Sequence, residues 1–329
     1  MPPIPPETKC LRFTIMFIWL HLLVLAAAWP CVWPFRICAF NAQHFGEKKV
    51  ANEDILNVVV KIVRRCDIFL LQEVHDPKGL VVSKLMGALN RPEDPFLAIS
   101  SPPIGRKSYK EQYVFIYRSS RITAKDQYKY EDNDPSAPDV FAREPYVVRF
   151  GLESAALQDL VVIPQHTEPD KAPTELEALY DVFLDVRSRW RCKNVVLMGD
   201  FNAGCSYLSK KKTKTLRLHK DPDFHWLISD GTDTTVKEST SCPYDRIVVY
   251  GQELTDLVRS SGIYNFTKEL RLTEAEALKV SDHYPVEMDL DLVLDLDLVL
   301  DLGGCRTLLP SLALIILSLS AACGFGDLL

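Results

Sequence analysis

Short apolar runs rich in β-branched and aromatic residues recur along the middle of the chain, separated by polar segments. The runs occupy residues 35–42, 66–74, 111–118, 145–152, 159–166, 194–202, 245–251 and 284–290. Runs of this length that are bounded by turn-forming residues are typical of β-strands. The pattern therefore predicts a protein built on many short strands.

Between several of these runs, apolar residues recur at intervals of three or four, which is the spacing of a helix with one buried face. This spacing is found at 49–65, 77–90, 173–190 and 274–278, whereas the polar, proline-containing segment 129–144 is expected to be a loop. No linker with a change of composition divides the region. Strands alternating with helices predict an α/β fold, a two-sheet β-sandwich flanked by helices in one large domain.

The N-terminal end has the pattern of a targeting segment. Lys9 and Arg12 precede an apolar run over residues 13–28, which ends in the small residues Ala26 and Ala28. This pattern predicts a cleavable secretory signal peptide at residues 1–28. An uncleaved signal anchor is the alternative, although the run is short for a span of about 20 residues.

The C-terminal end is apolar again at residues 308–323, after an Asp-Leu repeat at 289–302. Small residues before a hydrophobic C-terminal segment are typical of a glycolipid-anchor signal, but the polar spacer here is shorter than the usual ~8–12 residues. A degenerate tail is the alternative to membrane anchorage. We expect residues 29–289 to form the catalytic domain, and residues 290–329 to be a low-complexity and hydrophobic tail beyond it.

The whole chain, 329 residues with 47% hydrophobic and 25% charged residues, has a formal net charge of −6. No overall positive field attracts a polyanion, so nucleic-acid binding would require a local basic surface or metal ions. The best local candidate is the stretch KKKTKTLRLHK at residues 210–220. A merely solvated face is the alternative for this stretch.

Nine cysteines in a chain with a secretory signal predict at least one disulfide, although the sequence alone does not fix the pairing. Cys38, Cys66 and Cys192 lie in apolar contexts, which favours buried thiols for these three.

Polar side chains that could bind a metal or transfer a proton lie at the ends of the predicted strands, where rigid elements meet loops. The oxygen-bearing set is Asn41, Glu73, Asp200, Asn202 and Asp282, and hard oxygen ligands of this kind suit Mg²⁺, Mn²⁺ or Ca²⁺. His166 and His283 offer an acid–base pair for attack of water on a phosphate. Singly, such residues are as typical of salt bridges, caps or core histidines, so it is their joint occurrence that indicates a phosphoesterase.

Eight motifs then identify a resemblance. In chain order they are ICAFNAQHFGE, LLQEV, SYKEQYVFIYR, FAREPYVVRF, VVIPQHTEP, LMGDFNAGCSY, CPYDRIVVYG and SDHYPVE. From about residue 35 to 289 the chain resembles the deoxyribonuclease I family, in particular its secreted deoxyribonuclease-gamma-like branch, as in RCDIFLLQEV and DTTVKESTSC. The resemblance implies a two-sheet α/β sandwich that cuts DNA phosphodiester bonds with divalent cations.

The resemblance also implies roles for individual residues of the active site. Asn41 and Glu73 would hold the catalytic metal, and Asp200, Asn202 and Asp282 would complete the metal and phosphate site. Glu111 would orient His166, and Asp245 would orient His283, because a carboxylate on one imidazole nitrogen fixes the tautomer. Which histidine is the acid and which the base stays open.

By the same resemblance, the DNA contacts would be made from the minor groove with low sequence specificity. The implied contact residues are Tyr109 as the stacking residue, Arg106 and Arg143 as phosphate or groove contacts, and Ser206 and Tyr207 as phosphate contacts. At His75 the chain departs from deoxyribonuclease I, which has an arginine that enters the groove at this position. Binding is therefore expected to depend more on pH.

Further features are implied outside the catalytic centre. One structural calcium site would use Asp233 and Thr235, and another would use Asp132, Asp139, Glu144 and the backbone of Phe141; plain solvated acids are the alternative. Cys205 and Cys242 would form a disulfide. A sequon at Asn265 predicts N-glycosylation, a monomer is expected, and the motifs imply nothing about actin binding.

Two other functions remain as alternatives to a deoxyribonuclease. One is another phosphoesterase of the same fold, acting on phosphoinositides, sphingomyelin or abasic DNA, and the other is a catalytically inactive DNA- or protein-binding module.

Overall fold

The computed structural model describes residues 32–293, except for residues 107, 133–138 and 155. The predicted signal peptide and most of the predicted C-terminal tail therefore lie outside the described residues. Residues Pro34–Leu292 form one compact unit. In the described part of the chain, no helix is both long and apolar enough to cross a membrane.

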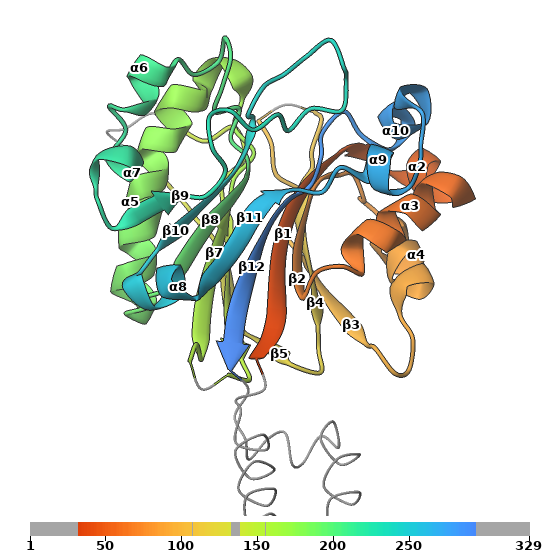
Figure 1. Ribbon diagram of the computed structural model, residues 1–329, viewed down its shortest axis with the longest axis horizontal. Coiled ribbons are helices and arrows are strands. Elements are labelled where there is room, and N and C mark those ends of the chain that lie inside the picture. The colour runs from red at the N-terminus through yellow and green to blue at the C-terminus, as the bar shows by residue number, and fades with distance from the viewer. Residues whose placement is uncertain (1–31, 107, 133–138, 155, 294–329) are drawn as a thin grey trace, which may run out of the picture. The chain divides into compact units, whose positions relative to one another are not determined.

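Two six-stranded sheets pack face to face (Figure 1). The first sheet has the strand order β11 (Val258–Ile263), β12 (Val286–Val293), β1 (Val32–Phe45), β2 (Ile68–Val74), β4 (Gln112–Arg118), β3 (Phe96–Ser100). The second sheet has the order β5 (Ile122–Lys129), β6 (Tyr146–Leu152), β7 (Asp159–Pro164), β8 (Val195–Asp200), β10 (Asp245–Tyr250), β9 (Phe224–Trp226). The neighbours β1–β2 and β7–β8 are parallel.

The strand pleat explains why the predicted strands are nearly continuous apolar runs. Successive side chains of a strand point to opposite faces, and here both faces are covered. In β1, Ile37 and Ala39 face the core between the sheets, whereas Cys38 and Phe40 face the helices outside.

Helices cover the outer face of each sheet (Figure 1). Over the first sheet lie α2 (Glu47–Ala51), α3 (Glu53–Val63), α4 (Leu80–Leu89), α9 (Phe266–Glu269) and α10 (Glu274–Val280). With the second sheet lie α5 (Ala172–Trp190), the short α6 (Lys210–Thr213) and α7 (Arg217–Lys220), while η1 (Pro169–Lys171) precedes α5 and α8 (Gln252–Leu257) follows β10. The predicted α/β sandwich of two sheets flanked by helices is confirmed.

The last strand is longer than the sequence pattern indicated. Strand β12 continues to Val293, so the start of the Asp-Leu repeat belongs to the first sheet rather than to a tail that begins after Asp289. Leu290 and Leu292 enter the core between the sheets, and Asp289 accepts a 2.7 Å hydrogen bond from Arg36 Nε. The alternation of Asp and Leu fits a strand here because its leucines face the core and Asp289 has a cationic partner.

Two disulfides are formed among the described residues. The expected Cys205–Cys242 bridge is confirmed. The interpretation of Cys38 and Cys66 as thiols was wrong, because they form a second bridge with Cα atoms 6.1 Å apart. Cys66 lies two residues before β2, the parallel neighbour of β1, and this pairing brings it within disulfide range of Cys38. Cys192 is buried and free, as expected.

Candidate active site

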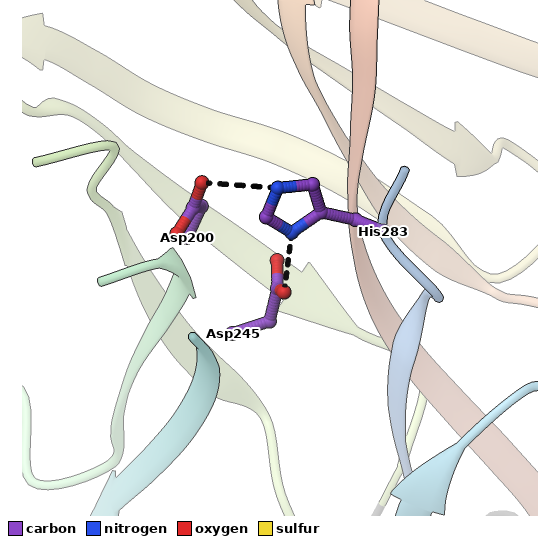
Figure 2. A group of neighbouring side chains, drawn as sticks. All are labelled: Asp200, Asp245 and His283. Carbon is purple, nitrogen blue, oxygen red and sulfur yellow. Dashed lines mark hydrogen bonds and ion pairs between the residues drawn. The ribbon is translucent and has the colours of Figure 1, made fainter. Parts of the chain in front are cut away.

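Two histidine–carboxylate pairs form the centre of the site, at the same end of both sheets. His166 follows β7, and its Nδ1 lies 2.6 Å from Glu111 Oε1, just before β4. His283 precedes β12, and its Nδ1 lies 2.7 Å from Asp245 Oδ2, at the start of β10 (Figure 2). A carboxylate accepts but does not donate, so each pair places the proton on Nδ1 and leaves Nε2 for chemistry.

Both pairs close across the boundary between the two sheets. His166 belongs to the second sheet and Glu111 to the first, whereas His283 belongs to the first sheet and Asp245 to the second. The catalytic geometry therefore depends on how the sheets are docked, and not on either sheet alone.

A single carboxylate oxygen lies between the two imidazoles. Asp200 Oδ2 is 3.6 Å from His166 Nε2 and 3.7 Å from His283 Nε2. Figure 2 shows Asp200 and Asp245 on opposite nitrogens of the His283 ring. The free nitrogens of both histidines thus face one small, acid-lined volume.

The pKa values of both histidines are raised. Burial favours the neutral form of His166, but Glu111 outweighs burial and raises its pKa above the usual value. Burial acts in the same way on His283, yet Asp245 and Asp200 raise its pKa well above the usual value. Each imidazole is therefore able to carry a proton near neutral pH.

The backbone around Asp200 allows the two sheets to approach closely. Gln72 of β2 donates to Gln165 O at 2.8 Å and accepts from Asp200 N at 2.9 Å, which joins the sheets beside the site. Gly199 has φ +132°, and a Cβ at this position would lie 2.3 Å from Gln165 O and 2.6 Å from Gln72 Nε2. Only glycine fits there without displacing Asp200.

The predicted metal ligands gather next to the histidines. Asn41 Nδ2 donates to Glu73 Oε1 at 2.9 Å and to Asp200 Oδ2 at 3.1 Å. Asp282 Oδ1 lies 3.9 Å from His283 Nε2. Asn202 N donates to Asp200 Oδ1 at 3.0 Å, and its side chain donates to Thr167 O at 3.1 Å, so it supports Asp200.

This donor set fits a hard divalent cation. Glu73, Asp200 and Asp282 offer carboxylate oxygens, and Asn41 offers an amide oxygen that here accepts from Gln43 N at 2.9 Å. Mg²⁺ and Mn²⁺ prefer oxygen ligands of these kinds. Among the described residues, Asp200, Asp245 and His283 are the one group of three His, Cys, Asp or Glu side chains whose ligand atoms lie within 4.8 Å of one another, so Glu73 and Asp282 are not brought that close to Asp200. We assign that second group to the acid–base machinery, because the hydrogen bond between His283 and Asp245 already uses Nδ1.

Sequence reasoning missed several residues that support the site. Lys49 Nζ donates to Ala42 O at 2.9 Å and Val280 O at 2.7 Å, and burial lowers its pKa to about 8 against the opposing charges of Asp282 and Glu73. Ser281 Oγ donates to Asn41 O at 2.6 Å. Gln72 had a sequence signal, a polar residue inside an apolar strand, but Lys49 and Ser281 had none.

The predicted stacking residue Tyr109 lies at the rim of the site. Its ring stacks on His75 with centroids 5.7 Å apart and planes at 11°. Its hydroxyl lies 2.9 Å from Nδ1 of His44, whose backbone N donates to Glu73 Oε2 at 2.8 Å. His44 and Glu73 have φ of 54° and 55°, a rare conformation for non-glycine residues that tends to cluster at functional sites.

The other predicted DNA contacts are divided between the rim and the interior. Arg143 pairs with Glu111 Oε1 at 2.8 Å, so it lies behind His166. Arg106 is exposed and pairs with Asp139 at 3.4 Å. Ser206 is exposed, and the Tyr207 ring lies 5.5 Å from that of Tyr244. The DNA-binding roles of these residues stay predictions.

The residues predicted to bind calcium already have protein partners. Asp233 Oδ1 accepts from Thr235 N at 2.9 Å and Thr235 Oγ1 at 2.7 Å. In the other loop, Glu144 lies 3.2 Å from Lys129, and Phe141 is buried. Asp132 adjoins residues 133–138, which lie outside the described part. Both calcium sites stay predictions.

The sequon residue Asn265 caps helix α9, where its Oδ1 accepts from Lys268 N at 2.9 Å. Its side chain is partly exposed. Glycosylation at Asn265 stays a prediction.

Comparison with known proteins decides the family. Residues 38–283 match the sequence profile of the endonuclease/exonuclease/phosphatase family. The chain belongs to this family. The match spans every residue of the two histidine pairs.

Curated relatives confirm the deoxyribonuclease resemblance. Deoxyribonuclease-1-like 1 from Bos taurus is 50% identical over 260 residues, which is 78% of this chain and 81% of the relative. The protein of the same name from Sus scrofa is 48% identical, with 86% and 89% covered. Deoxyribonuclease gamma from Rattus norvegicus is 47% identical, with 78% and 84% covered.

Solved structures confirm the fold. An endonuclease/exonuclease/phosphatase from Bacteroides vulgatus matches with a TM-score of 0.57 at 18% identity, covering 79% of this chain and 99% of its own. A mannosyl-6-phosphatase from Bacteroides thetaiotaomicron matches with a TM-score of 0.55 at 16% identity, with 79% and 100% covered. At these identities the likeness speaks for the fold alone.

Proposed function

We propose that this chain is a secreted, divalent-metal-dependent endonuclease that hydrolyses phosphodiester bonds of double-stranded DNA with low sequence specificity. The observation that carries the proposal is the pair of carboxylate-braced histidines whose Nε2 atoms face Asp200 from two sides, at 3.6 and 3.7 Å. Relatives named deoxyribonucleases support DNA as the substrate.

The two histidines divide the proton transfers of the reaction. One Nε2 takes a proton from the attacking water, and the other gives a proton to the leaving sugar oxygen. Glu111 and Asp245 hold the rings in orientation and stabilise whichever imidazole becomes charged. Asp200 keeps both nitrogens directed at the same volume, while Gln72 and Gly199 hold Asp200 in place.

The cation would be held by Asn41, Glu73, Asp282 and Asp200. A bound Mg²⁺ or Mn²⁺ supplies positive charge that stabilises the phosphoryl oxygens of the substrate. We further propose Ca²⁺ for the loop sites at Asp233–Thr235 and at Asp132–Glu144.

The platform of Tyr109 and His75 would contact the sugars and bases at the minor groove. An aromatic face is tolerant of sequence, and the minor groove distinguishes little beyond A·T from G·C, so low specificity follows. Arg106, Ser206 and Tyr207 would contact phosphates, which position the duplex without reading it.

Export through the secretory pathway is supported by the apolar segment 13–28 and by two disulfides in the described chain. N-terminal sequencing of protein secreted from cultured cells tests cleavage near residue 28. A mobility shift on deglycosylation that disappears in Asn265→Gln tests the sequon. Retention on the cell surface, released by a phospholipase specific for glycolipid anchors, would instead support an anchor in the C-terminal tail.

The deciding assay incubates the purified protein with supercoiled plasmid, Mg²⁺ and Ca²⁺, with and without chelator. Nicking that the chelator abolishes is the expected result. Intact plasmid with turnover of a phosphoinositide or sphingomyelin would overturn the proposal in favour of another phosphoesterase. DNA binding without turnover of any phosphate ester would support an inactive binding module.

Single histidine variants test the mechanism in the same assay. His166→Ala and His283→Ala are each expected to lose at least ~10²-fold in rate, because each removes a proton-transfer group. His219→Ala, at an exposed histidine on α7 packed beside Trp226, is the control and should keep its rate. Near-normal nicking by either catalytic variant contradicts the two-histidine mechanism.

A further inference from the structure

The basic stretch at residues 210–220 has two parts with different uses. Arg217 makes a two-pronged ion pair with Asp181, with both contacts at 2.7 Å, and also pairs with Glu177 at 2.6 Å, so it serves the fold. The lysines differ. Lys210, Lys211, Lys212 and Lys214 are all exposed, and within the described part of the chain none has a carboxylate at ion-pair distance. We call these four residues the lysine cluster.

The lysine cluster is held on a fixed surface. Ser209 Oγ caps α6 by accepting from Lys212 N at 3.3 Å. Leu208 and Leu216, on either side, are buried in the core outside the second sheet. Thr213 is buried as well and donates to Ser209 O at 3.2 Å. The apolar residues anchor the segment, so the lysines necessarily face solvent.

Contacts link this surface to the catalytic centre. The His283 ring lies 6.2 Å from the Tyr244 ring, which in turn lies 5.5 Å from the Tyr207 ring, three residues before Lys210. A cavity of about 270 Å³ adjoins this path, and Cys205, Lys210, Ser241 and Arg246 are among its lining residues. Two ring contacts therefore connect His283 with Tyr207, which lies three residues before the first lysine of the cluster.

We propose that the lysine cluster is an exosite for the phosphate backbone of duplex DNA beyond the cleaved bond. The inference rests on the proposed nuclease function and extends it. A chain with net charge −6 repels a polyanion overall, and a cation at the catalytic centre compensates only the reacting phosphate. Unpaired lysines beside the site supply the missing local attraction, and as point charges they do so without reading sequence.

Duplex DNA is the occupant that these observations favour. A long polymer whose backbone is cut between His166 and His283 leaves the centre over the surfaces next to it, and Tyr207 and the lysine cluster form one of them. Each lysine that contacts a phosphate releases condensed counterions, so the contribution must weaken as salt rises. A duplex too short to reach α6 should not experience the exosite.

The test neutralises three of the lysines and leaves Lys210, which lines the cavity, unchanged. The variant is K211Q/K212Q/K214Q. The control, K61Q/R191Q/K193Q, removes the same charge from exposed residues that precede β2 and β8, at the ends opposite to Glu73 and Asp200. Binding of labelled long and short duplexes is measured with chelator present, and cleavage is measured separately with Mg²⁺ and Ca²⁺, at ionic strengths between about 50 and 200 mM.

For the long duplex, the slope of log affinity against log salt should become shallower by about 2 to 3 in the lysine variant. KM for long DNA should rise about tenfold at ~150 mM salt, whereas kcat and the rate on the short duplex should stay within about twofold. The control should match the wild type. An unchanged slope, or an equal change in the control, overturns the exosite.

The binding arm separates this inference from the proposed function. Loss of cleavage with intact, lysine-dependent binding would contradict the nuclease proposal and leave the exosite standing. Absence of wild-type binding to the long duplex would overturn the exosite directly. Single K212E substitution gives a second variant if the triple variant does not fold, and the same slope change of reduced size is then expected.

Discussion

At the scale of single residues, the site depends on where protons are held. Glu111 and Asp245 bind Nδ1 of their histidines at 2.6 and 2.7 Å, which leaves both Nε2 atoms facing Asp200. The carboxylates raise both histidine pKa values against the effect of burial. Each limb of a pH–rate profile should therefore report one histidine together with its carboxylate.

The substitution Asp245→Asn should shift one limb of the pH–rate profile and leave the other in place. Asp245 raises the pKa of His283, so its neutral amide replacement should lower that pKa and move the limb that His283 controls to lower pH. The limb controlled by His166 should stay in place. If His283 is the base, the acidic limb moves, and if it is the acid, the alkaline limb moves, so kcat/KM against pH also assigns the roles. Glu111→Gln is the matched variant and should move the other limb. A profile in which neither limb shifts would contradict the bracing role of Asp245.

Glu175 on α5 is another buried carboxylate, and it has no role in the reaction. It accepts from Gln165 Nε2 at 2.9 Å and from Glu168 N at 3.1 Å. Burial raises its pKa to about 7, against the hydrogen bonds and Arg143. Because this is an acid with a raised pKa, its contribution to stability is full below its ordinary pKa of 4.5 and is lost as pH rises through about 7.

Glu175→Gln should remove this pH dependence. Between pH 5 and 8, the wild-type free energy of unfolding should fall by about 2 to 3 kcal/mol more than that of the variant. Urea denaturation at several pH values measures the difference. Glu153→Gln, at an exposed carboxylate, is the control and should follow the wild type. Parallel curves for wild type and Glu175→Gln would show that burial of Glu175 costs nothing.

At the scale of elements, the strands that the sequence predicted are the inner strands of both sheets. The strands that it missed, β3, β5, β9 and β11, are the four sheet edges. An inner strand is covered on both faces and reads as an apolar run. An edge strand is partly solvated, and in β5 and β11 most positions are exposed or half-buried, so the apolar signal is lost.

The same contrast applies to the site. Residues with reactive side chains at the ends of inner strands, such as Glu73, His166 and Asp200, were predictable from type and position. Lys49 and Ser281 were not, because they act through backbone carbonyls of distant segments, Val280 and Asn41 respectively. The Cys38–Cys66 bridge was equally hidden, since it follows from strand adjacency and not from local composition.

Gly199→Ala tests the close approach of β8 to the first sheet. The added Cβ would meet Gln165 O at 2.3 Å with φ at +132°, so the variant should lose about 3 kcal/mol of stability and most of its activity. Gly87→Ala on α4 is the control. There a Cβ meets no heavy atom within 4 Å, and helix propensity should add about 0.5–1 kcal/mol. Thermal unfolding compares the two, and a Gly199→Ala protein with wild-type stability would contradict the assigned contact.

At the scale of the whole molecule, the boundary of the folded unit runs through the Asp-Leu repeat. Leu290 and Leu292 are 0% and 4% exposed in the core between the sheets. Asp291 lies 3.5 Å from Arg259 of the neighbouring strand β11. The beginning of a low-complexity segment is thus part of the sandwich.

Truncation locates this boundary. A chain that ends at Val293 keeps β12 and should unfold like the full chain. A chain that ends at Asp289 loses two buried leucines, worth about 1.5–3 kcal/mol each, and should be less stable by about 3–6 kcal/mol. The midpoints of denaturant unfolding of the two truncated proteins show whether residues 290–293 contribute to stability. Equal midpoints would restore Asp289 as the end of the domain.

The crossing of the histidine pairs between the sheets also bears on how activity arises during folding. Glu111 and His283 come from the first sheet, and His166 and Asp245 from the second. A chain that has formed one sheet and not the other contains no complete pair. Under the proposed function, a newly made chain has no nuclease activity until its final docking step, and a fragment released by proteolysis loses that activity along with its partner sheet.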